Sequence, residues 1–189
     1  MLLAPFPAPR PYPVRLEPAL RAHGLRLRGA VDADLPALRT LYASTREELA
    51  TLPWPAAATD AFIADQFRLQ HLHYVMHYPD AHFLVLDAPE GVAGRLYHGC
   101  GNGTAADLGL DLVIDVSLMP RFRGQGIGST LLRAAIDYAA SRGRAVALHV
   151  HAQNLRARQL YERLGFVAHG DAGLHVEMRR LPAAACRVS

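Results

Sequence analysis

The sequence is poor in cysteine and contains no long apolar run. It has 2 cysteines, Cys100 and Cys186, and their isolated positions fit neither a metal site nor a disulfide framework. We therefore expect no bound metal and a reducing, cytoplasmic environment. No apolar stretch approaches the roughly 18 residues of a membrane-spanning helix. The opening MLLAPFPAPRPYP has too many prolines for the apolar core of a signal peptide, so we predict no membrane association.

The chain also lacks a strong excess of charge of either sign. Its 20 basic and 17 acidic residues give a formal net charge of +3, and arginine carries the basic count. This balance is too mild to favour nucleic acid as a partner, although a local cluster of arginines could bind phosphate.

The remaining composition is typical of a folded soluble domain. Apolar residues make up 51% of the sequence and charged residues 20%, and a chain of 189 residues is long enough for one domain with a sizeable core. Residues 1–24 are rich in proline and alanine and lack periodicity, so we predict a flexible lead-in there. We place the folded domain at residues 25–181 and a short tail at 182–189.

Periodicity predicts both strands and helices in the first half of the domain. LRLRGAV alternates like a strand, and Asp32 can cap a helix whose leucines share one face. Thr59 or Asp60 can cap a second helix that ends near His77. HFLVLDA and VAGRLYHGC then have the pattern of a hairpin around a turn at residues 89–91.

The second half alternates strands with helices. The strand DLGLDLVIDVSLM precedes a helix at 126–141, and the strand RAVALHVHA precedes a helix at 154–164. FVAHG and LHVEMRRL have the pattern of two final strands. The order β-α-α-β-β-β-α-β-α-β-β mixes hairpins with helical crossovers, which predicts an α+β domain with a mixed sheet.

The stretch RFRGQGIG, residues 121–128, contains more glycine than a turn between a strand and a helix needs. Gly124, Gly126 and Gly128 let the backbone approach a ligand closely and turn its N–H groups inward. The predicted helix behind the loop adds the positive end of its dipole. Together these features predict a site for phosphate or pyrophosphate. The loop is neither a Walker loop nor a dinucleotide fingerprint, because its spacing and its late place in the chain differ from both.

Two motifs together resemble the GNAT superfamily of N-acetyltransferases. Residues 123–128, RGQGIG, match its Arg/Gln-x-x-Gly-x-Gly/Ala signature. Residues 154–166, NLRARQLYERLGF, match Asn-x-x-Ala-x-x-Leu-Tyr-x-x-x-Gly-Phe, a more specific pattern that follows a strand in the family. The resemblance covers about residues 25–181 and is strongest from 110 to 167. It implies a mostly antiparallel central sheet flanked by helices.

The resemblance implies an enzyme that moves an acetyl group from acetyl-CoA, its co-substrate, to a primary amine. It places the arm of acetyl-CoA along the strand before the glycine loop and the pyrophosphate on the loop amides. It makes Tyr161 the proton donor to the leaving thiolate, a role that a phenol near the sulfur can fill. The residues implied in cofactor binding are Val116, Ser117, Leu118, Arg123, Gly124, Gln125, Gly126, Ile127, Gly128, Ser129 and Asn154.

The resemblance does not fix the group that takes the proton from the amine. Asp115 interrupts the apolar strand LVIDV, where an unpaired buried carboxylate is costly; it is either the base or a structural hydrogen-bond acceptor. His149 lies five residues before Asn154, and histidine titrates near neutral pH; it is either the base or an ordinary sheet histidine. Strand alternation places His149 and His151 on one face.

The amine acceptor should meet the first two helices and the loop between them, where this family varies. We select Glu47, Glu48, Trp54 and Tyr74 as substrate candidates, since the two glutamates could attract a cationic amine. The sequence does not name the amine, and it leaves a homodimer open. An alternative to the enzyme is a non-catalytic module that binds acyl-CoA and regulates a partner.

Overall fold

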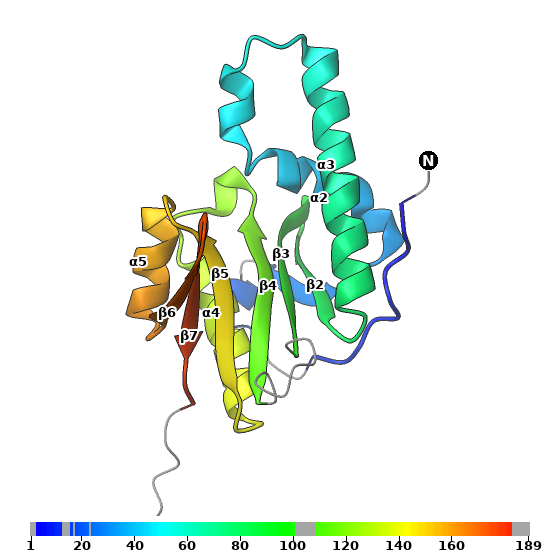
Figure 1. The fold of residues 1–189 in the computed structure, drawn as a ribbon. Coiled ribbons are helices and arrows are strands. Elements are labelled where there is room, and N and C mark those ends of the chain that lie inside the picture. The colour runs from blue at the N-terminus through cyan, green and yellow to red at the C-terminus, as the bar shows by residue number, and fades with distance from the viewer. Residues whose placement is uncertain (1–2, 13–15, 17, 23, 101–108, 183–189) are drawn as a thin grey trace, which may run out of the picture.

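The computed structural model describes residues 3–12, 16, 18–22, 24–100 and 109–182, which form a domain around one mixed sheet (Figure 1). The described strands are ordered β1-β2-β3-β4-β5-β7-β6. They are β1 (Arg26–Gly29), β2 (His82–Ala88), β3 (Gly91–Cys100), β4 (Leu110–Leu118), β5 (Ala145–His151), β6 (Val167–Ala172) and β7 (His175–Arg180). The helices are α1 (Pro18–Ala22), α2 (Leu35–Ala43), α3 (Ala56–His77), α4 (Ile127–Ala140) and α5 (Leu155–Arg163), with 3-10 turns η1 (Asp32–Asp34), η2 (Glu47–Thr51) and η4 (Pro120–Phe122).

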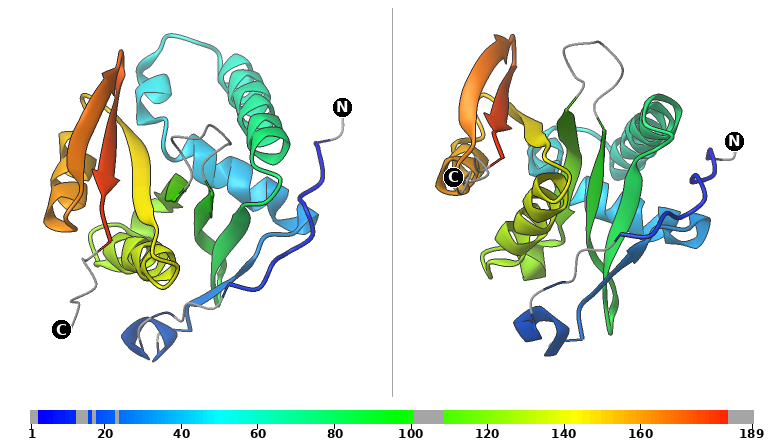
Figure 2. Two further views of the ribbon diagram at one scale, coloured as in Figure 1. Left: turned by 60° about the horizontal axis from the view of Figure 1, so that its bottom comes forward. Right: turned by 90° about the horizontal axis from the view of Figure 1, so that it is seen from below.

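This arrangement confirms the predicted α+β fold with a mostly antiparallel sheet flanked by helices. β4 and β5 are parallel, and the other neighbouring strands are antiparallel. α4 lies on one face of the sheet, and α2 and α3 lie on the other (Figure 2). In the described part of the chain, no helix combines the length and apolar character that crossing a membrane requires. Residues 101–108, after β3, and residues 183–189, which include Cys186, lie outside the described residues.

The alternation of side chains in the central strands supplies a core on each face of the sheet. In β2, Phe83 and Val85 belong to one core, and Leu84 and Leu86 belong to the other. α4 covers the second core with residues such as Leu131, whereas α2 and α3 close the first. Because both faces are covered, β2 is apolar almost throughout and lacks the polar alternation of a strand with one solvated face.

Two helix starts differ from the sequence prediction. α3 begins at Ala56 rather than at Thr59 or Asp60. Pro55 precedes the helix with an extended backbone, and the three alanines that follow it favour helix more than the polar residues do. The first predicted helix begins at Asp32 as the 3-10 turn η1, and α2 continues from it.

The described part of the proline-rich lead-in packs against the domain, in contrast to the flexible segment expected from its composition. The ring of Phe6 lies 4.7 Å from that of His71, 5.5 Å from Phe83 and 6.3 Å from Tyr97, measured between centroids. Residues 3–12 are therefore held by contacts with distant parts of the chain. Composition and local periodicity do not report such contacts, and the domain boundary at residue 25 stays a prediction.

β4 and β5 separate before either strand ends. Their parallel ladder pairs Leu110–Val113 with Ala145–Leu148, yet β4 continues to Leu118 and β5 continues to His151. At the same point β4 contains an extra residue, Ile114, relative to its pairing with β3, and such a bulge bends a strand and redirects its side chains. Within the described residues, the last part of β4 thus has no partner on its β5 side. This opening in the sheet positions the candidate site.

Candidate active site

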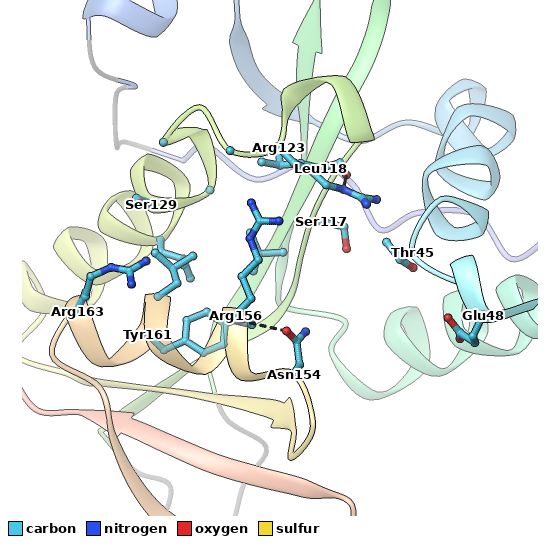
Figure 3. Close-up of a pocket in the computed structure, with 17 residues that line it drawn as sticks. Thr45, Glu48, Ser117, Leu118, Arg123, Ser129, Asn154, Arg156, Tyr161 and Arg163 are labelled. Atoms are coloured by element: carbon cyan, nitrogen blue, oxygen red, sulfur yellow. Dashed lines mark hydrogen bonds between the residues drawn. The ribbon is translucent and has the colours of Figure 1, made fainter.

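A cleft of about 760 Å³ lies at the end of β4, between the glycine loop and α5 (Figure 3). Thr45 and Glu48, from the segment after α2, lie across from α5 and close a further side. Most of the residues implied in cofactor binding line this cleft. They are Val116, Ser117, Leu118, Arg123, Gly124, Gly126, Gly128, Ser129 and Asn154.

At two positions the glycine loop has a backbone conformation that would strain any residue other than glycine. Gly124 has a φ of +76° and Gly126 a φ of +78°, both in the left-handed region. A Cβ built on Gly126 would meet no atom within 4 Å, so the space in front of it is open to a ligand. α4 starts directly after Gly126, at Ile127. Its first N–H groups and its positive dipole end therefore face the loop, which suits an anionic group.

Arg123 anchors the loop to the rest of the domain. Its Nε donates to the carbonyl of Leu118 at 2.9 Å. Its Nη2 donates to the carbonyl of Ser44 at 2.8 Å and to the Ser44 hydroxyl at 3.1 Å. The guanidinium thus joins the loop to β4 and to the segment after α2. The arginine of the motif has a structural task in addition to its place in the cleft wall.

Gln125 and Ile127 are not among the described residues that line the cleft. The side-chain amide of Gln125 donates to the carbonyl of Arg121 at 2.6 Å. The Ile127 residue is 2% exposed and belongs to the core under α4. For these two residues, only the backbone can take part in the cofactor binding that the motif implied.

α5 supplies two cations that the sequence prediction missed. Arg156 and Arg163 line the cleft (Figure 3), and neither forms an ion pair with another described residue. Both arginines stand at positions where the motif accepts any residue. The motif therefore could not predict that they line the cleft. Asn154 begins the helix, because its Oδ1 accepts the N–H of Ala157 at 3.1 Å. The two guanidinium groups make the cleft suited to phosphate.

Tyr161 lies between this cleft and a second, smaller cavity of about 260 Å³. The residue is 9% exposed. Burial, followed by the negative charge of Asp115, raises the pKa of the Tyr161 phenol to about 12. The hydroxyl is therefore protonated at neutral pH and can donate a hydrogen bond.

The smaller cavity occupies the opening between β4 and β5. Val116 and Tyr161 line both cavities, so the two meet at these residues. The structure thus brings both candidate bases to the same place as the candidate proton donor. The polar residues of the smaller cavity are Asp115, His149, His151, His175, Arg46 and Tyr161.

Asp115 accepts hydrogen bonds on both carboxylate oxygens. Its Oδ2 accepts from Nη2 of Arg95 at 2.6 Å and from the hydroxyl of Tyr74 at 3.1 Å. Its Oδ1 accepts from the hydroxyl of Ser117 at 2.6 Å. Arg95 is 3% exposed, so the carboxylate also balances a buried charge. These contacts support the structural-acceptor interpretation of Asp115 rather than the catalytic one.

His149 is exposed and borders the same cavity as His151, as strand alternation predicted. Its neighbour across the ladder on β7 is Glu177, which forms an ion pair with Arg179. These contacts do not give the imidazole a structural role. Because His149 lines the cavity, its ring can contact a substrate bound there. Among the described residues, no group of three or more His, Cys, Asp or Glu is arranged to hold a metal ion.

The four substrate candidates lie in different places. Glu48 lines the larger cleft, and Glu47 begins η2. The Tyr74 hydroxyl is bound to Asp115, and burial, followed by the charge of Asp115, raises its pKa. Trp54 packs edge-on against Phe62 at 5.4 Å and lines a separate cavity beside α3. The structure therefore brings Glu48 to the cleft but not Trp54.

Comparison with known sequences gives one family and several partial relatives. The profile of the Acetyltransferase (GNAT) family matches residues 38–166. A Bacillus subtilis (strain 168) protein, named as a candidate ribosomal protein bS18-alanine N-acetyltransferase, is 29% identical over 99 residues, or 52% of this chain and 62% of that protein. An uncharacterised N-acetyltransferase of Methanocaldococcus jannaschii is 45% identical over 53 residues, or 28% of this chain and 24% of that protein. The chain thus spans less than two thirds of the length of these relatives.

Solved structures share the fold at low sequence identity. A PaiA N-acetyltransferase from Thermoplasma acidophilum, in complex with coenzyme A, has a TM-score of 0.64 and 19% identity, covering 83% of this chain and 98% of that chain. The ribosomal-protein-S18-alanine N-acetyltransferase from Escherichia coli has a TM-score of 0.57 and 20% identity, covering 87% of this chain and 99% of that chain. At these identities the likeness establishes the fold.

Proposed function

Because the chain belongs to the acetyltransferase (GNAT) family, we propose that it transfers an acetyl group from acetyl-CoA to a primary amine. The amine attacks directly, within a ternary complex of both substrates. The observation that carries this proposal is the meeting of two cavities at Tyr161 and Val116. One cavity is large and lined by cations, and the other is small and lined by groups that can accept a proton.

The larger cleft fits acetyl-CoA by the chemistry of its lining. Open space in front of Gly126 lets the backbone N–H groups of the loop reach a pyrophosphate. Arg156 and Arg163 add positive charge for phosphate groups. The part of β4 beyond Val113 has backbone groups without a β5 partner, which can bind the amides of the pantetheine arm. When bound, acetyl-CoA supplies the acetyl group as a thioester.

Tyr161 donates a hydrogen bond to the sulfur as the C–S bond breaks and the C–N bond forms. Its pKa of about 12 keeps the hydroxyl protonated for this purpose. An ordinary thiol has a pKa of about 8.5, so complete proton transfer from this phenol to the thiolate is uphill. The hydroxyl therefore stabilises the departing thiolate mainly through a charge-assisted hydrogen bond.

His149 takes the proton from the amine. Its imidazole borders the small cavity together with Tyr161, and neutral imidazole is the usual general base of enzymes at physiological pH. Asp115 has the same neighbourhood, but its oxygens already accept bonds from Arg95, Tyr74 and Ser117. We therefore assign Asp115 a structural role, in which its hydrogen bonds fix the residues around the cavity, and we assign proton transfer to His149.

Release of free CoA thiol from acetyl-CoA, measured with a panel of primary amines, tests the proposed function. We expect amine-dependent release by the wild-type protein, with one acetylated amine formed per thiol. Tyr161→Phe should lower turnover by roughly 10- to 1,000-fold, as expected for loss of a hydrogen-bond donor to the leaving group, while CoA affinity changes little. Binding of CoA without thiol release for any amine would instead identify a non-catalytic acyl-CoA module.

A further inference from the structure

We propose that the amine acceptor is a free amino acid, and that Arg46 binds its carboxylate. This inference rests on the proposed function and names the class of acceptor. Its starting point is that a cation, Arg46, lines the cavity next to Tyr161. Arg46 belongs to the smaller cavity, whereas Glu48 belongs to the larger cleft.

Arg46 is held in place by neutral groups. The residue follows α2, and its guanidinium carbon lies 4.6 Å from the centre of the Tyr42 ring. Its Nη1 donates to the Thr45 carbonyl at 3.3 Å and to the Thr45 hydroxyl at 3.2 Å. No described carboxylate forms an ion pair with Arg46. The stacked guanidinium is therefore preorganised, and it retains donors for an external carboxylate.

Among the residues whose side chains the structure describes, the other groups around the cavity do not cancel this positive charge. Asp115 is the lining carboxylate, and the buried guanidinium of Arg95 neutralises it. Glu177 stands beside the cavity strand, but it is paired with Arg179 and is not among the lining residues. The remaining polar lining consists of three histidines and Tyr161. The cavity as a whole therefore favours an anion and disfavours an acceptor that carries only positive charge.

The size of the cavity fits this acceptor. A volume of about 260 Å³ lies just below the range usual for drug-sized ligands, so a small metabolite fills it. His149 and Tyr161 border the same space as Arg46, which places the amine and the anion of one small molecule within the cavity together. In an α-amino acid the two groups are separated by one carbon. A peptide N-terminus carries a neutral amide at that position and gives Arg46 no charge to pair with.

The test compares each standard amino acid with its carboxamide, because the pair differs only in the charge that Arg46 should recognise. Affinity for the CoA-loaded protein is measured by calorimetry, and kcat/KM is measured by thiol release. The variants are Arg46→Gln, which removes the charge, and Arg46→Lys, which keeps it without the planar fork. Arg39→Gln is the matched control, since Arg39 lies on α2, pairs with Asp60 and is not a lining residue.

We expect the preferred amino acid to bind about 10- to 100-fold more tightly than its carboxamide, as for a hydrogen bond to a charged group. Arg46→Gln should abolish this preference by weakening binding of the acid alone, Arg46→Lys should keep part of it, and Arg39→Gln should keep all of it. The proposal is overturned if no amino acid binds, if acid and amide bind equally, or if Arg46→Gln weakens both alike. Preferential binding of the acid without any thiol release would uphold the anion site and overturn the acetyltransferase proposal.

Discussion

Asp115 and His149 border the same small cavity, yet their surroundings suggest opposite roles. Asp115 sits in a buried ion pair with Arg95, and each of its oxygens has a donor. His149 is exposed on the neighbouring strand. Removing the partner of a buried charge is costly to the fold, whereas replacing an exposed imidazole is not. Stability and rate should therefore respond separately to changes at the two residues.

His149→Gln should lower kcat/KM for the amine by about 100- to 10,000-fold, the usual contribution of a general base, with an unchanged melting temperature. Asp115→Asn should instead destabilise the fold by about 3 kcal/mol or more, which lowers the melting temperature by roughly 6–12 °C in a chain of this length. His151→Gln is the control, because His151 borders the same cavity two residues further along β5. An equal loss of rate in His149→Gln and His151→Gln would contradict the assignment of the base.

The sequence identified the residues of the site that local spacing determines. Gly126 and Tyr161 belong to motifs of fixed spacing, and both line the cleft. Arg156 and Arg163 were missed because each lies at a position that the motif leaves unspecified. Trp54 was selected for its residue type and its loop, but it packs against Phe62 of α3 instead. Side-chain direction in such a loop depends on tertiary packing, which a local pattern does not contain.

At the scale of elements, the site depends on how the glycine loop joins α4. The backbone reverses at Gly126 with positive φ, and α4 begins at the next residue. The first N–H groups of α4, which have no partner within the helix, therefore lie beside the cleft that Gly126, Gly128 and Ser129 line. A second glycine of the same kind, Gly143, follows the other end of α4 with a φ of +67°, and a Cβ added there would also meet no atom within 4 Å. The two glycines thus share a positive φ but lie at opposite ends of α4.

Gly126→Val should weaken CoA binding at least about 10-fold, because a β-branched residue resists positive φ and its side chain enters the space in front of the loop. Gly143→Val carries the same backbone penalty and should lower stability by a similar amount, while leaving CoA affinity unchanged. Calorimetric titration with CoA and thermal melting of both variants measure the two effects. Equal CoA affinity in both variants would show that the loop does not bind the pyrophosphate.

The helices and strands were largely predictable from the sequence, whereas the way in which they pair and separate was not. The apolar run of β2 and the hairpin around residues 89–91 appear directly in the sequence, and the structure confirms them. The separation of β4 from β5 after Val113 could not be predicted in this way. It depends on a bulge at Ile114 and on which strand lies on each side, and neither is encoded in the periodicity of one segment. The cavity between these strands could therefore not be predicted from the sequence.

At the scale of the whole molecule, three histidines hold the segment 3–12 against the domain. The carbonyl of Ala4 lies 2.7 Å from Nε2 of His71. The Tyr12 ring packs edge-on against His82 at 4.9 Å, and its hydroxyl lies 3.3 Å from Nδ1 of His98. These contacts join the segment to α3, β2 and β3.

Each of these histidines has a lowered pKa. Burial is the main cause, and for His98 it lowers the pKa to about 4. The charged groups nearby act in both directions. Asp111 raises the pKa of His98 and Arg142 lowers it, whereas Arg95 lowers the pKa of His71. The net effect keeps all three rings neutral in the folded protein at neutral pH.

The fold should therefore lose stability on acidification. Between pH 6.5 and about 4 the unfolded chain binds a proton at His98 that the folded chain does not, so the free energy of unfolding falls as the pH falls through this window. At about 1.4 kcal/mol per pH unit, the loss for His98 reaches about 3 kcal/mol. Below the folded pKa both states are protonated and the contribution stays constant.

Urea unfolding at pH 7, 6, 5 and 4.5 measures this loss. His98→Gln should make the dependence shallower, because glutamine does not titrate, while His71 and His82 still contribute. A wild-type midpoint that does not change from pH 7 to pH 4.5 would contradict the prediction.

The position of the segment 3–12 also constrains the order in which the chain can acquire its structure during synthesis. This segment leaves the ribosome well before its partners, because Ala4 contacts His71 and Tyr12 contacts His98, 67 and 86 residues later. Until then its apolar rings have no native surface to cover, and the nascent chain carries them exposed. Contacts of such long sequence separation form late and slow folding. The segment translated ahead of the domain is thus among the last to reach its native contacts.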